Sequence, residues 1–190
     1  RPAKDWKVAA YIDFYSRIIP AAAGEHIDGG TNLGIYANKR FSAKNQLEFK
    51  LNRKNYFDDV KFTSSVKYIF KFTKRIKFSQ KLVMINGKEQ IKENMSTAFN
   101  SQLSYRTKKS SVTIGTTQYF STRSDYRLYL YEPGIPFHFN MVSLSGTGRN
   151  YFINFYQEIN DNIDFYLTAK QMTKVNSDKY SLQFQLLVAL

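Results

Sequence analysis

Apolar and polar side chains alternate along most of this chain with a period of two residues. In the segment 180–190 the residues Tyr180, Leu182, Phe184 and Leu186 share one parity, whereas most residues of the other parity are polar. Successive side chains of a β-strand point to opposite faces, so this segment has one apolar and one polar face. It contains neither Gly nor Pro and has the length of a tilted transmembrane strand, about 9–11 residues.

The same alternation recurs in nine further segments, and no segment shows the i, i+3, i+4 periodicity of an amphipathic helix. The predicted strands cover residues 6–15, 31–41, 47–52, 62–72, 76–84, 95–106, 112–120, 149–158, 163–170 and 180–190. About ten long strands of this kind predict an all-β fold, an antiparallel up-and-down transmembrane β-barrel. The chain forms either the whole barrel or the C-terminal part of a larger one.

Segments without alternation divide into two groups by length. The short ones lie at 42–45, 73–75, 108–110 and 160–162; the others lie at 18–30, 55–59, 86–93 and 176–179 and run longer in most cases. Outer-membrane barrels have short periplasmic turns and long external loops, so we expect the first group and Leu190 at the periplasmic rim.

The predicted topology also requires residues 121–146 to form one long external excursion of a single barrel domain spanning 1–190. Within it, the alternating segments 126–131 and 137–141 predict a hairpin that stands above the membrane and turns at 132–134.

Composition supports a membrane barrel more than its average hydropathy suggests. Aromatic residues make up 16% of the chain and cluster near the predicted strand ends, where rings with a polar tip suit the bilayer interface. The mean hydropathy of −0.45 is compatible with this, because every second strand residue of a barrel faces a wet interior. The lack of Cys excludes disulfides and thiolate metal sites. Because the chain starts at Arg1, we expect a mature form or a fragment.

Two segments carry a resemblance to a known group of proteins. The stretch 126–134, YRLYLYEPG, followed by 146–151, GTGRNY, resembles the C-terminal barrel region of Bacteroidota-type outer-membrane proteins, some of which carry an N-terminal helix-hairpin-helix domain. The alternating C-terminal strand also resembles the insertion signal of outer-membrane barrels. The resemblance implies a barrel in the bacterial outer membrane and names no substrate. Because the helix-hairpin-helix part is absent from this sequence, a DNA-binding role does not carry over, and we do not expect nucleic acid as a partner.

Catalytic chemistry is not predicted. His26 and His138 are the only histidines, and no nucleophile is placed beside either of them. Histidines and carboxylates do not recur at metal-ligand spacing. The segment 146–148, GTG, does not open a helix and is therefore not a phosphate loop. We expect neither an enzyme nor a bound metal or cofactor.

The net charge of +13 points to anionic partners. The polar parity carries a set of cations that the barrel topology turns toward the interior: Lys50, Lys67, Lys71, Lys77, Lys81 and Arg106. Basic rings in pores favour anions, so this set predicts a small anion-preferring pore; the alternative is a scaffold whose interior is filled by ion pairs and water. The three-residue turn 73–75 predicts that Lys67 faces Lys81 and that Lys71 faces Lys77, with Glu48 on the preceding strand as a compensating charge.

Two further functional hypotheses follow from the same pattern. A soluble lipocalin-like binding barrel would turn the apolar parity inward. A structural or docking subunit of an outer-membrane complex would contact other outer-membrane proteins through residues 121–146.

Overall fold

The computed structural model describes the backbone of residues 5–21, 24–56, 59–89, 92–122, 128–132, 135–136, 141–174 and 177–188. Side chains are described in the same segments, except at 15–28, 56, 59, 88–89 and 92–93.

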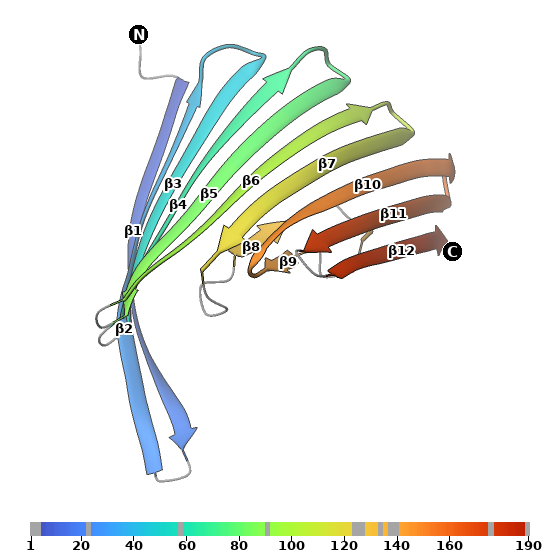
Figure 1. Cartoon of the computed structure of the whole chain (residues 1–190). Coiled ribbons are helices and arrows are strands. Elements are labelled where there is room, and N and C mark those ends of the chain that lie inside the picture. The colour runs from blue at the N-terminus through green and yellow to red at the C-terminus, as the bar shows by residue number, and fades with distance from the viewer. Residues whose placement is uncertain are drawn as a thin grey trace.

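Ten antiparallel strands form one sheet in which neighbours in sequence are neighbours in space (Figure 1). They are β1 (Trp6–Ala21), β2 (Gly24–Arg40), β3 (Asn45–Tyr56), β4 (Asp59–Lys71), β5 (Ile76–Glu89), β6 (Lys92–Arg106), β7 (Ser110–Ser121), β10 (Thr147–Asn160), β11 (Ile163–Lys174) and β12 (Ser177–Val188). The strands β8 (Leu128–Tyr131) and β9 (Met141–Leu144) form a separate two-stranded hairpin. Each of the ten predicted strands is found, and the prediction of an up-and-down antiparallel fold is confirmed. No helix in the described segments is long and apolar enough to cross a membrane.

The strands are longer than the alternation predicted. Residues 18–30 were expected to form a loop, but β1 and β2 stay paired through Ser16 and Gly29 up to Ala21 and Gly24. The loops predicted at 55–59, 86–93 and 176–179 are likewise mostly strand, because β3, β4, β5, β6 and β12 extend into them. A ladder is held by main-chain groups, which pair whether or not the side chains alternate. Those loop predictions are therefore wrong. The two ends of the sheet differ clearly in loop length only because of the segment that connects β7 to β10.

Each of three neighbouring short turns is closed by a side-chain hydroxyl at its start. Ser42 Oγ accepts hydrogen bonds from the backbone N–H groups of Lys44 and Asn45, both at 3.1 Å. Thr73 Oγ1 accepts from Arg75 and Ile76 at 3.1 and 3.0 Å. Ser and Thr favour such turns because they satisfy main-chain donors locally. The turn beginning at Thr107 repeats this arrangement with the N–H groups of 109 and 110.

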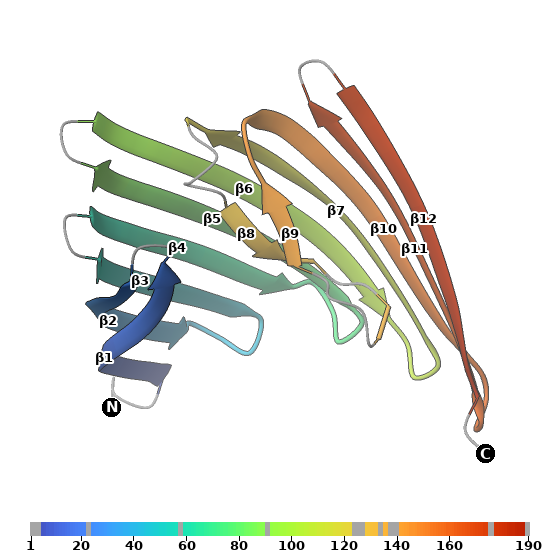
Figure 2. The ribbon, with the colours of Figure 1, turned by 90° about the horizontal axis from the view of Figure 1, so that it is seen from below.

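The sheet curves strongly, and its two faces differ in chemistry (Figures 1 and 2). The apolar parity is exposed on the convex face in nine of the ten strands and half-buried in β11. Representatives of it are Ile12, Ile35, Phe49, Val66, Leu82, Phe99, Ile114, Ile153, Leu182 and Phe184. The strand registers align these positions into continuous apolar rows, such as Phe49–Val66–Leu82–Phe99. The soluble lipocalin-like alternative required this parity on the inside, and the curvature places it outside.

The β8–β9 hairpin lies on the concave side of the sheet (Figure 2). Leu128 and Leu144 are fully buried in a cluster with Val83, Ile85 and Ala98 of the sheet. The hairpin was expected to stand above the membrane; it packs instead on the concave face of the sheet (Figure 2), where its leucines find an apolar partner. β8 lies within the predicted strand 126–131, whereas β9 begins where the predicted strand 137–141 ends.

Three glycines in the sheet each lie directly opposite an aromatic residue. Tyr11 pairs with Gly34, Phe152 with Gly115, and Tyr119 with Gly148. A Cβ at Gly34 would lie 2.1 Å from the Tyr11 ring, and one at Gly115 would lie 2.3 Å from the Phe152 ring. The rings therefore lie flat over the glycines. Each ring covers the backbone of its glycine, which has no side chain to cover it.

Candidate anion-binding face

The basic residues predicted from the sequence lie on the concave face. Lys81 shares its parity with Val83 and Ile85, which pack under the hairpin, so its side chain starts from the same face. In the register of β4 and β5, Lys67 lies opposite Lys81, and Lys71 lies opposite Lys77. The register prediction is confirmed.

The other members of the predicted set belong to the same face. Lys50 on β3 lies opposite Ser65, the partner of Val83. Its ammonium lies 5.4 Å from the centre of the Tyr36 ring, a distance at which cations are attracted to aromatic faces. Arg106 ends β6, two residues beyond Ser104, which pairs with Lys77.

Negative charge near this set comes mainly from Glu48, which lies opposite Lys67 as expected. Like charges directly opposite each other destabilise a strand pair. A bound anion would therefore relieve the repulsion within the Lys67–Lys81 and Lys71–Lys77 pairs. That these six residues bind anions stays a prediction.

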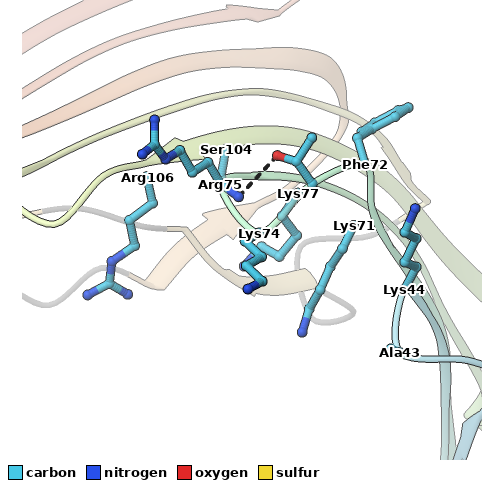
Figure 3. A pocket seen from close by; sticks show the side chains of 10 residues that line it. Ala43, Lys44, Lys71, Phe72, Lys74, Arg75, Lys77, Ser104 and Arg106 are labelled. Carbon is cyan, nitrogen blue, oxygen red and sulfur yellow. Dashed lines mark hydrogen bonds between the residues drawn. The ribbon is translucent and has the colours of Figure 1, made fainter.

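Short turns add cations that the parity argument missed. A cavity of about 620 Å³ lies where the turns 41–44 and 72–75 approach the end of β6 (Figure 3). Its lining contains three predicted residues, Lys71, Lys77 and Arg106, and three from the turns, Lys44, Lys74 and Arg75. The lining also includes Thr73 and Ser104 but neither Asp nor Glu. The signal in the sequence was the repeated pattern of a hydroxyl residue followed by Lys or Arg, at 42–44, 73–75 and 107–109.

At the opposite end of the concave face, a buried carboxyl group joins the hairpin to the sheet. The Glu132 carboxylate, which follows β8 and is 0% exposed, lies 3.3 Å from the Lys170 ammonium of β11. It also accepts a hydrogen bond from the Asn150 side chain of β10. Burial raises the pKa of the Glu132 carboxyl above its ordinary value, against the opposing effects of Lys170 and of hydrogen bonds from Asn150 and Thr117. The hairpin is thus fixed to β7, β10 and β11 as well as packed on β5 and β6.

No group of three or more His, Asp or Glu residues that could hold a metal occurs among the described residues. The side chain of His26 and the whole of His138 lie outside the described residues.

A ten-stranded antiparallel up-and-down sheet, apolar on its convex face and polar on its concave face, is the architecture of porin-like β-barrels. Among solved structures, the chain is similar to the NanC porin, with a TM-score of 0.52 and 11% sequence identity over 98% of this chain and 98% of that one. At this identity the similarity concerns the fold. No protein-family model matches the chain. No curated protein matches it either.

Proposed function

We propose that the chain is an integral β-barrel of the bacterial outer membrane whose concave face lines a small anion-preferring pore. The apolar convex face meets lipid, and the polar concave face meets water. The narrower assignment to Bacteroidota-type outer-membrane proteins, from the segments 126–134 and 146–151, is part of this proposal.

The membrane also imposes a condition on the sheet edges. Hydrocarbon offers no hydrogen-bond partners, so open edges do not face lipid. The edge strands of the described sheet are β1 and β12. In the membrane we expect them to be paired, which closes the barrel.

The pairing of Lys67 with Lys81 and of Lys71 with Lys77 is the observation that carries the anion preference. Four lysines are concentrated on two adjacent strands, and in register they face only one carboxylate, Glu48. The hairpin packs against Val83 and Ile85, farther along β5 than Lys77 and Lys81.

Reversal potentials in planar bilayers under a KCl gradient test the proposal. Wild type should prefer chloride, and Lys67→Glu/Lys81→Glu should reduce or reverse that preference because four units of charge change at the middle of the lumen. The matched control is Lys39→Glu/Arg53→Glu, which makes the same charge change on the convex face, where Lys39 lies by Trp6 and Arg53 by Phe62. An unchanged preference in the Lys67/Lys81 variant, or no conductance of wild type, contradicts the proposal.

A docking role is the second candidate, because the hairpin presents aromatic side chains away from the sheet. Tyr129 and Tyr131 are 57% and 69% exposed, while Leu128 and Leu130 on the opposite face are buried. Exposed tyrosines are typical of protein interfaces. A purified chain that inserts into bilayers and never conducts would favour docking through residues 121–146 over transport.

A further inference from the structure

The cavity at the short turns is a built concentration of positive charge. Main-chain hydrogen bonds fix the turns beside the neighbouring strands: Lys71 N–H donates to the Lys44 carbonyl, and Arg106 N–H donates to the Arg75 carbonyl, both at 2.9 Å. Four of the cations thereby sit in two adjacent pairs. Lys77 lies opposite Lys71, which joins these pairs across β4 and β5.

Side-chain directions divide these cations between the two sides of the turns. Figure 3 shows that Lys71, Lys74 and Arg106 extend to one side, whereas Lys44, Arg75 and Phe72 extend to the other. Phe72 makes an edge-to-face contact with Phe70, with ring centres 4.7 Å apart, on the apolar side of β4. The aromatic ring therefore belongs to the lipid-facing band, and the space beside the lysines stays polar.

The charges in this cavity are not neutralised within the described part of the chain. No carboxylate of that part lies within ion-pair distance of the six cations; the ion pairs found there join Lys109 to Glu158 and Lys170 to Glu132. The volume of about 620 Å³ lies in the range of small-molecule sites, about 300–1,000 Å³. Lys supplies point charges and Arg a planar fork, and together they suit oxygens of phosphate or clustered carboxylates.

We propose that Lys71, Lys74, Lys77 and Arg106 form a binding site for a compact anion with at least two negative charges. A single carboxylate or chloride would leave most of these cations unpaired, whereas a phosphate ester or diphosphate contacts several at once. The site lies at the short-turn mouth of the lumen, and this placement rests on the proposed function. The anion is either a free solute or the phosphate of a lipid headgroup.

Calorimetric titration of the full chain in neutral detergent with inorganic pyrophosphate, at constant ionic strength, tests the site. We expect saturable binding that weakens at least tenfold in Lys74→Gln/Lys77→Gln. Lys7→Gln/Lys179→Gln, which removes the same charge from β1 and β12, should bind as wild type does. Absence of saturable binding to wild type overturns the site, and so does equal weakening in both variants, because net charge alone would then explain the binding.

Competition identifies the source of the anion. If dihexanoylphosphatidic acid displaces pyrophosphate at lower concentration than inorganic phosphate does, the ligand is a lipid headgroup; the reverse order indicates a free solute, and both orders support the phosphate site. Because this binding is measured without conduction, its failure is distinct from failure of the pore. A chloride-preferring pore without pyrophosphate binding removes the site alone, and pyrophosphate binding by a chain that never conducts removes the pore alone.

Discussion

Replacing Val66 with Arg is expected to be far more damaging than replacing its neighbour Ser65 with Arg. Val66 lies near the middle of β4 on the convex face, between Phe49 and Leu82. These three side chains are 38%, 37% and 40% exposed without lipid, so they contact the hydrocarbon in a membrane. Ser65 starts from the concave face, opposite Lys50 and Val83.

The magnitudes separate the two variants. Arg on the lipid face at the bilayer midplane costs about 2–4 kcal/mol in barrel proteins. Arg at position 65 faces water, and its main penalty is repulsion from Lys50, about 0.2–1 kcal/mol for a directly opposed pair. We therefore expect Val66→Arg to lower the free energy of unfolding by about 1–4 kcal/mol more than Ser65→Arg does.

Urea titrations of the protein folded in phosphatidylcholine vesicles measure this difference, with tryptophan fluorescence of Trp6 as the signal. Val66→Leu serves as the control for a change of shape without charge, and it should unfold at nearly the wild-type midpoint. Equal losses for Val66→Arg and Ser65→Arg would refute the assignment of faces, and a larger loss for Ser65→Arg would reverse it.

Two further outcomes follow from the concave face. The raised pKa of Glu132 means that the docked hairpin holds its proton at pH values where an undocked hairpin has released it. Docking should therefore strengthen as pH falls from the docked pKa toward the ordinary Glu value of about 4.3, and Glu132→Gln should abolish this trend. Hydrogen-exchange protection factors of the β8 and β9 amides measure the strength of docking. An identical trend in the variant would contradict the reasoning. Gly115→Ala should cost about 1–3 kcal/mol by overpacking, because the new Cβ meets the buried Phe152 ring at 2.3 Å. Adding Phe152→Leu should recover much of that loss in the same urea titration, and no recovery would show that the ring is not the obstacle.

Strand positions and facing could be predicted from the sequence because burial on one face imposes a period of two. The same logic gave the Lys67–Lys81 and Lys71–Lys77 pairs, since a short turn fixes the register of both strands. Strand ends could not be predicted in this way. Beyond the apolar band both faces of β1 and β2 lose the alternation, yet their main chains remain paired to Ala21 and Gly24.

The missed parts of the site depend on contacts between distant segments. Leu128 and Leu144 alternate as a free hairpin would, and nothing local indicates that they pack on β5 and β6. Glu132 and Lys170 are far apart in sequence, so their ion pair forms only through the tertiary structure. Period-two alternation assigns no face to turn residues such as Lys44, Lys74 and Arg75. Their positions depend on the hydrogen bonds of Ser42 and Thr73, which hold those turns in place.

The glycine–aromatic pairs couple the substitutions that certain positions of this chain can accept during evolution. Tyr11 and Gly34 belong to different strands, but a side chain at 34 cannot coexist with the ring at 11 as it lies. The same holds for Gly115 with Phe152. Gly148 differs, because a Cβ there would meet the backbone oxygen of Thr173 at 2.5 Å whatever residue stood at 119. In the first two pairs either substitution alone is disfavoured, so lineages should change both members or neither. Relatives should therefore show 11 with 34 and 115 with 152 as covarying columns, which would trace the β1–β2 and β7–β10 registers without a structure.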